Sequence, residues 1–155
     1  MCGVPQGSIL GPLLFLLYIN DLTNSSAMLE FVIFADDTNV FLSHSSCCEL
    51  FRLVNEELCK VSNWFKANKL SLNLNKTNFI VFSTPRKLLP SSLPNLLIDS
   101  TEIPQVKTVK FLVVYVDQHL TWSPHIDQIA NKVAKNSGII KRISHLLSPK
   151  VLIML

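Results

Sequence analysis

Charged residues are scarce in this 155-residue sequence: Asp, Glu, Lys and Arg make up only 16% of it, whereas hydrophobic residues make up 48%. This composition excludes a disordered tail, because disordered segments hold too little apolar surface to offset the entropy of ordering the chain. The length allows one domain with a real core but not two comfortable ones. So apolar a chain also fits a piece of a larger globule whose formerly buried surface is uncovered.

Cysteine is sparse as well, and its spacing excludes two kinds of site. Cys2, Cys47, Cys48 and Cys59 include no C-x-x-C pair, and no two histidines have H-x-x-x-H spacing, so zinc-ligand spacing is absent. Cys48 and Cys59 would lie roughly 16 Å apart on one helix, at about 1.5 Å per residue. A disulfide framework is therefore not expected. This favours a reducing, intracellular setting rather than a secreted protein, with nucleus or cytoplasm left open.

Membrane spans and common nucleotide-binding loops are missing too. The apolar run from Ile9 to Ile19 is shorter than the roughly 20 residues that a transmembrane helix needs. It also lacks the flanks of a signal peptide. No G-x-G-x-x-G, P-loop or G-x-S-x-G motif occurs. The net charge of +3 permits a nucleic-acid partner without requiring one. We therefore expect no membrane partner.

Helices and hairpins alternate in the remaining pattern. An apolar run predicts a helix over 8–20 (or from Gly11-Pro12), and apolar residues at three- and four-residue steps predict helices over 46–69 and from 123 onward. Short apolar runs bounded by turn residues predict strands over 29–34, 38–42, 78–82, 96–98 and 109–116. A Pro- and Ser-rich loop is expected over 85–94. The sequence thus predicts an α+β fold, an antiparallel sheet with packed helices.

Helix ends and buried faces carry further expectations. Ser46 and Glu49 form a capping-box pattern, and Ser123-Pro124 is a typical helix start. Ser148-Pro149 repeats that signal, and a chain ending within the helix it begins suggests truncation. The helix over 8–20 is apolar all round and should be buried on most sides. The last helix should bury one row of residues: Ile126, Ile129, Val133, Ile140, Ile143 and Leu147.

Asp36 and Asp37 stand side by side at the expected turn between the first two strands. Two adjacent carboxylates among Val, Ile and Phe are electrostatically costly unless a positive group is near. A bound Mg²⁺ or Mn²⁺ would supply that charge, because hard cations prefer carboxylate oxygens. Asp is also common in turns, where its side chain accepts hydrogen bonds from nearby backbone N–H groups. From these two residues alone the turn role is favoured, and both interpretations stay open.

The surrounding sequence changes that balance. Residues 3–8 read GVPQGS, residues 34–37 read FADD, residues 72–77 read LNLNKT and residues 109–112 read VKFL. In this order, and over almost the whole chain, these motifs resemble the reverse transcriptase of non-LTR retrotransposons, above all the LINE-like and jockey-like elements of animals. The resemblance implies RNA-templated DNA synthesis, in which the primer 3′-hydroxyl attacks a nucleoside triphosphate. The partners would be an RNA template, a DNA primer and a dNTP.

The resemblance also assigns parts and residues. Residues 1–117 would be an incomplete polymerase palm that includes the primer-grip region, and residues 118–155 the start of a helical thumb. Asp36 and Asp37 match the carboxylates that hold Mg²⁺ or Mn²⁺. Lys76 matches a lysine that neutralises the leaving pyrophosphate, although a solvated turn explains it equally well. The positions that match nucleotide and template contacts are Gln6, Gly7 and Ala35.

Aromatic residues near these motifs have simpler expected roles. Phe34 and Phe41 are expected in the core rather than as platforms for base stacking. Trp122 is expected as a packing anchor between sheet and thumb. Where the family usually has Leu-Gly, this chain has Leu112-Val113, so an altered primer grip is expected.

A second departure concerns what the family has before GVPQG. There, a further metal-binding aspartate lies on an upstream strand, together with the fingers. No acid of this chain matches it, and two-metal chemistry needs ligands for ions about 4 Å apart. We therefore expect a C-terminal fragment that is inactive alone, unless a separate upstream segment completes it. The alternative is a non-catalytic nucleic-acid-binding or interaction remnant that uses cations of the last helix: Lys132, Lys135, Lys141 and Arg142.

Overall fold

The computed structural model describes residues 7–87, 90, 93–148 and 151–152. These fall into two compact units, the first formed by Met1–Phe79 with Leu88–Gln105 and the second by Ile80–Lys87 with Val106–Leu155. Each unit is described by itself below. The expected loop residues Gly3 and Pro5, and Pro149 of the last start signal, lie outside the described residues.

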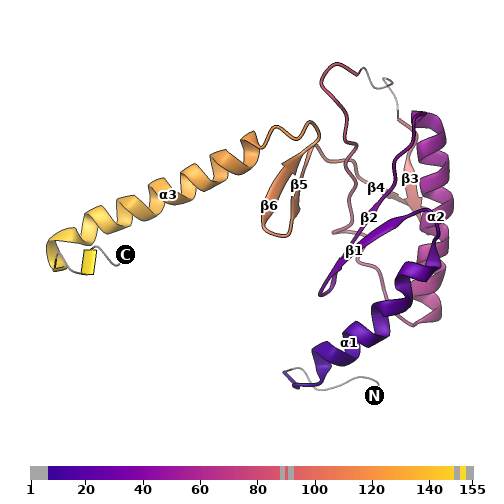
Figure 1. Cartoon of the computed structure of the whole chain (residues 1–155), viewed down its shortest axis with the longest axis horizontal. Helices are drawn as coiled ribbons and strands as arrows, with labels where there is room; N and C mark the ends of the chain where they lie inside the picture. The colour runs from indigo at the N-terminus through magenta and orange to yellow at the C-terminus, as the bar shows by residue number, and fades with distance from the viewer. Residues whose placement is uncertain (1–6, 88–89, 91–92, 149–150, 153–155) are drawn as a thin grey trace. The chain divides into compact units, whose positions relative to one another are not determined.

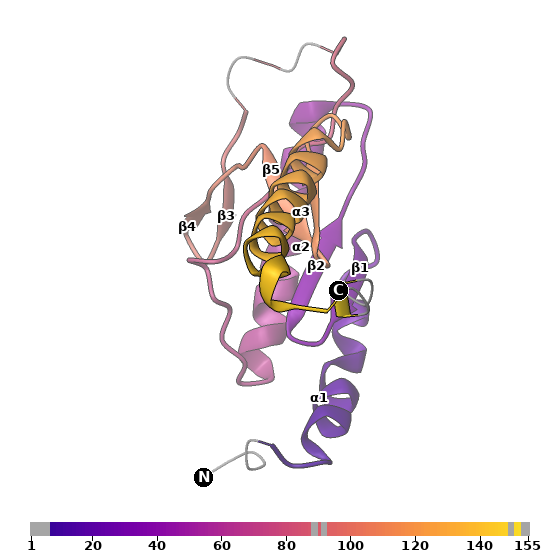
Figure 2. The ribbon, with the colours of Figure 1, turned by 90° about the vertical axis from the view of Figure 1, so that its left-hand side faces the viewer.

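The first unit combines two helices with two antiparallel hairpins (Figure 1). Its elements are α1 (Gly11–Ile19), the 3-10 helix η1 (Asn20–Ser25), β1 (Glu30–Phe34), β2 (Asp37–Phe41), α2 (Cys47–Ala67), β3 (Leu96–Ile98) and β4 (Thr101–Ile103). β1 pairs with β2 and β3 with β4. The β3–β4 hairpin lies along α2 (Figure 2).

The core of this unit lies between α2, η1 and the inner face of the β1–β2 hairpin. Leu22 is fully buried, and Val61 and Phe65 of α2 are 5% and 8% exposed. Phe31 and Ile33 pack against them because alternate residues of a strand point to the same side. The apolar face of α2 therefore lies where its three- and four-residue spacing places it.

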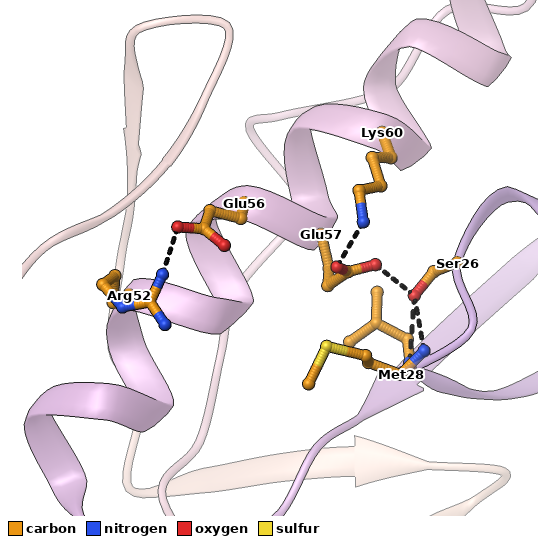
Figure 3. Close-up of polar contacts among 7 residues, drawn as sticks. Ser26, Met28, Arg52, Glu56, Glu57 and Lys60 are labelled. Carbon is orange, nitrogen blue, oxygen red and sulfur yellow. Dashed lines mark hydrogen bonds and ion pairs between the residues drawn. The ribbon is translucent and has the colours of Figure 1, made fainter.

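A buried acid ties α2 to the segment before β1. Glu57 is only 2% exposed; its Oε2 accepts a hydrogen bond of 2.6 Å from Ser26 Oγ, and its Oε1 faces Lys60 Nζ at 2.6 Å (Figure 3). Ser26 Oγ in turn accepts the backbone N–H groups of Met28 and Leu29. Lys60 and Ser26 lower the pKa of Glu57 despite its burial. This cluster fixes where β1 begins relative to α2.

The second unit is a hairpin followed by a long helix. Its elements are β5 (Thr108–Phe111), β6 (Val114–Asp117), α3 (Ser123–Ile143) and the 3-10 helix η2 (Ser144–Leu146). β5 and β6 are antiparallel, with Phe111 paired to Val114 across the turn. Residues 80–87 join this unit through a backbone hydrogen bond of 3.0 Å from Ser83 N–H to the Gln118 carbonyl. In the described ranges, no helix is long and apolar enough to cross a membrane.

The α+β class is confirmed: the described elements are helices and small antiparallel sheets. Two strand predictions were wrong. Residues 78–82 form no strand; within them only Phe79 makes an isolated bridge, to Gln105. The expected strand over 109–116 is instead a hairpin, because Leu112 and Val113 turn the chain. The short strand β4 was not predicted.

The predicted burial of α1 and α3 was also wrong. In α1 only Ile19 is buried, and Leu13, Leu16 and Leu17 are 55%, 52% and 67% exposed. In α3 no residue is buried, and Ile126 is 60% exposed. The sequence identifies the apolar residues of both helices, but the described parts of each unit leave most of these residues uncovered.

Both predicted caps differ in detail. Ser46 is the N-cap of α2, but its side chain makes no capping hydrogen bond, and Glu49 pairs with Arg52 instead. α3 begins at Ser123, with Trp122 rather than Ser123 at the N-cap position. The N-cap position of α3 was thus predicted one residue too late.

Candidate metal-binding hairpin

The turn between β1 and β2 has two residues, Ala35 and Asp36. Phe34 pairs directly with Asp37, so the hairpin is as tight as hairpins become. Ala35 has a φ of 52°, whereas Asp36 keeps a negative φ. A positive φ at only the first turn position is typical of a type II′ turn, where glycine is preferred. A small residue at position 35 thus suits the turn, and it would also leave room for a nucleic-acid strand that passes close by.

Asp36 and Asp37 are both exposed to solvent. Asp36 lies at the tip, and Asp37 begins β2 on the same side of the hairpin as Phe34 and Val32, which are 61% and 39% exposed. Among the described residues, neither acid forms an ion pair. Two unpaired carboxylates beside an exposed apolar strip are therefore open to an incoming cation.

The hairpin fits part of a site for a divalent metal. Carboxylate oxygens at Asp36 and Asp37 are the donors that Mg²⁺ and Mn²⁺ prefer. However, in residues 7–87, 90, 93–148 and 151–152 no group of three His, Cys, Asp or Glu lies close enough to hold a metal. Hard cations take about six oxygen ligands. The chain's own hairpin would therefore supply two ligands and leave the others to water, substrate or further protein groups.

Lys76 and Gly7 each lie in a turn of the backbone. Lys76 is exposed in the turn after α2, where its N–H donates to the Asn73 carbonyl at 3.0 Å, and it makes no ion pair with either aspartate in the described structure. Gly7 has a φ of 86°, and a Cβ there would meet nothing within 4 Å. Its backbone conformation, rather than a close contact, is what calls for glycine. Gln6 lies outside the described residues.

Phe34 and Phe41 are not core residues, contrary to expectation. They are 61% and 39% exposed, on the outer side of the hairpin. Because Phe31 and Ile33 point inward, the alternation of the strand turns Phe34 outward. The outer side of the hairpin therefore presents aromatic surface next to Asp37.

The Leu112-Val113 departure lies at the turn of the β5–β6 hairpin. Leu112 has a φ of 44° and Val113 a φ of 80°. Two positive values in a two-residue turn are typical of type I′, where Asn-Gly is the preferred pair. Glycine at the second position would remove the strain of a β-branched residue in the left-handed region. Sequence reasoning located the anomaly but not its cause.

The structural role of Asp117 was not predicted from the sequence. Asp117, at the end of β6, is 8% exposed and accepts three backbone hydrogen bonds from the connection to α3. The available signal was an Asp followed by Gln-His-x-Thr and a Ser-Pro helix start, because Asp side chains often accept backbone N–H groups of the next few residues.

Comparison with known proteins matches this chain to polymerases. The family described as "Reverse transcriptase (RNA-dependent DNA polymerase)" matches residues 1–136. The probable RNA-directed DNA polymerase from transposon X-element of Drosophila melanogaster is 33% identical over 162 residues, covering 97% of this chain. The RNA-directed DNA polymerase from mobile element jockey of the same species is 28% identical over 149 residues, covering 89% of this chain.

The relatives are much longer than this chain. It spans 17% of the X-element protein and 16% of the jockey protein. The Pol polyprotein from type-1 retrotransposable element R1 of Bradysia coprophila is 27% identical over 143 residues, 91% of this chain and 14% of that protein. No solved structure matches. With a family match over residues 1–136, the chain belongs to the reverse transcriptase family and is homologous to the RNA-directed DNA polymerases of non-LTR retrotransposons.

Proposed function

We propose that this chain is the later part of the palm and the start of the thumb of an RNA-directed DNA polymerase. The carrying observation is the tight β1–β2 hairpin, which leaves Asp36 and Asp37 exposed and unpaired within the FADD motif of a reverse transcriptase. Residues 1–117 would form the palm and primer grip, and residues 118–155 the start of the thumb. The substrates would be an RNA template, a DNA primer and a dNTP.

Asp36 and Asp37 would hold the divalent cation, Mg²⁺ or Mn²⁺. When bound, such a cation lowers the pKa of an attacking hydroxyl and neutralises charge on a transferring phosphate. The side chains of the hairpin would orient it: Asp36 from the tip of the turn and Asp37 from the start of β2. Ala35, Gly7 and Gln6 would leave room for, or contact, the nascent base pair.

The chain by itself would not polymerise. Its hairpin offers two carboxylates, and the described residues offer no third ligand beside them. Lys76 would act on the leaving pyrophosphate only when the nucleotide is also held by protein groups outside these 155 residues. The exposed leucines of α1, including Leu13 and Leu17, are consistent with a surface that the rest of a polymerase covers.

RNA-templated primer extension tests this proposal. We expect no extension by the 155-residue chain alone in Mg²⁺. A chimera in which this chain replaces the aligned stretch of the jockey polymerase should extend the primer. Extension by the chain alone, abolished by Asp36→Ala, would overturn the claim of inactivity. An inactive chimera that folds and binds primer–template would overturn the polymerase assignment.

A second candidate is duplex binding without catalysis. Lys132, Lys135 and Arg142 of α3 are exposed, and in the described residues none of them forms an ion pair. They are free to contact phosphates. Binding of an RNA–DNA duplex by the chain alone, weakening steeply with salt, would support this role. Undetectable or salt-independent binding would refute it.

A further inference from the structure

The connection from β6 to α3 is organised around the side chain of Asp117. Its Oδ1 accepts the backbone N–H of Thr121 at 2.8 Å and of Trp122 at 3.0 Å, and its Oδ2 accepts that of His119 at 3.1 Å. Burial alone would raise the pKa of Asp117, but these donors together lower it below the usual range. The carboxylate therefore stays ionised at neutral pH, where it holds these donors most strongly.

The backbone of this connection adopts conformations that non-glycine residues avoid. Leu120 has a φ of 55° and Trp122 a φ of 65°. Such conformations persist only where the surrounding structure dictates them. Asp117 supplies that constraint, because it holds the N–H groups on both sides of Leu120 and that of Trp122 itself. The side chain of Asp117 thus holds the backbone of this loop at three positions.

Trp122 contributes to this corner, residues 117–126, through its backbone rather than through its ring. Contrary to its expected role as a packing anchor, its side chain is exposed, with 47% of the residue accessible. Its N–H donates to Asp117, and its carbonyl accepts the N–H groups of His125 at 3.1 Å and Ile126 at 3.0 Å, the first turn of α3. Asp117 and the start of the helix are therefore linked through one residue.

Two further contacts join this connection to β6 and to residues 80–87. His125 Nδ1 accepts the backbone N–H of Tyr115 in β6 at 3.4 Å. His119 Nδ1 lies 2.9 Å from the Ser83 carbonyl. Beyond this corner no residue of α3 is buried. The described contacts that set the direction in which α3 leaves the β5–β6 hairpin therefore include those made by residues 117–126.

We propose that Asp117 is a positioning residue that fixes the direction of α3 relative to the β5–β6 hairpin, so that both elements hold the same primer–template duplex. The second half of this statement rests on the proposed polymerase function. The first half does not. Asp117 itself would touch neither substrate nor metal.

Distances between the β5–β6 hairpin and α3 test whether Asp117 fixes the direction of the helix. Spin labels are placed at two exposed lysines, Lys110 of β5 and Lys135 of α3, through a noncanonical amino acid so that the native cysteines stay. We expect a narrow distance distribution in the unaltered chain, a broad one with Asp117→Ala, and an intermediate one with Asp117→Asn, which retains one acceptor oxygen. Asp127→Asn, at an exposed acid of α3, is the matched control and should leave the distribution narrow.

Circular dichroism separates loss of direction from loss of folding. Helix content in Asp117→Asn should equal that of the unaltered chain. If Asp117→Ala does not fold, the distance measurement on Asp117→Asn decides the question alone. Distributions as narrow as that of the unaltered chain in both variants would overturn the proposal.

Primer extension by the jockey chimera tests the second half. We expect Asp117→Asn to reduce the number of nucleotides added per binding event severalfold, while the rate of incorporating the first nucleotide stays within about twofold. A merely structural defect would lower both equally and would overturn the link to the duplex, as would unchanged processivity. An inactive unaltered chimera would count against the proposed function, and the distance measurement would still decide the role of Asp117.

Discussion

Val113→Gly should stabilise the protein. Val113 occupies the second position of the β5–β6 turn with a φ of 80°, and its side chain is largely exposed, with 71% of the residue accessible. A left-handed conformation costs a residue with a side chain roughly 1–2 kcal/mol. Glycine removes that cost but gains freedom in the unfolded chain worth about 0.5–1 kcal/mol. Because little apolar burial is lost, the net gain should be about 1 kcal/mol.

Urea denaturation followed by circular dichroism measures this effect. The midpoint should rise with an unchanged slope, and the Tm should rise by about 2–4 °C for a chain of this size. Val32→Gly is the matched control, because Val32 is a half-exposed valine within β1 and its φ is not positive. It should lower stability, since glycine weakens a strand interior. A lowered or unchanged midpoint for Val113→Gly would refute the strain argument.

Three further predictions concern the core, the buried acid and the basic helix. Leu22→Ala should cost about 2–5 kcal/mol in urea denaturation, whereas Leu17→Ala, at an exposed site, should stay within about 0.5 kcal/mol; equal effects would contradict the assigned core. Ser26→Ala should cost about 1–3 kcal/mol, because it leaves buried partners unsatisfied. Since the pKa of Glu57 is lowered, its stabilisation is present above the unfolded pKa of about 4.3 and is lost as pH falls through the folded value, so Glu57→Gln should flatten the acid limb of a Tm-against-pH curve. Lys135→Ala should reduce the salt slope of RNA–DNA duplex binding by about 1, and an unchanged slope would exclude a phosphate contact.

Local patterns were enough to predict much of the fold. The β1–β2 hairpin, α2 and the starts of α1 and α3 followed from periodicity and turn residues, because those signals act within a few residues. The strand expected at Asn78–Phe82 failed because strand formation needs a partner, and among the described residues only Gln105 provides a bridge to it. Apolar residues alone do not specify that partner.

The exposure of α1 and α3 and the geometry of the β5–β6 turn were not predicted, for a different reason. The apolar residues of α1 and α3 were evident from the sequence, but whether they are buried depends on contacts with groups far away in the sequence. The turn at Leu112-Val113 has neither Gly nor Asn, so the usual signal for a type I′ hairpin was missing. The structural role of Asp117 was not predicted, because that role depends on the backbone path of residues 119–122.

The candidate site was located by motif and remains a proposal in its chemistry. In the structure Asp36 is exposed in the β1–β2 turn and Asp37 is exposed at the start of β2, and Lys76 forms no ion pair with either acid in the described residues. The distance from Lys76 to the reacting groups would depend on where the nucleotide binds. The sequence alone does not predict that position.

Single-turnover nucleotide incorporation by the jockey chimera tests the central claim most directly. With Mg²⁺, RNA template, DNA primer and one dNTP, Asp36→Ala should lower the rate at least about 10²-fold, since metal coordination contributes several kcal/mol to such reactions. Asp21→Ala, at an exposed acid in the 3-10 helix η1, should leave the rate within about twofold. A rate for Asp36→Ala equal to that of Asp21→Ala would contradict the assignment of the β1–β2 hairpin as the metal-holding turn of a reverse transcriptase.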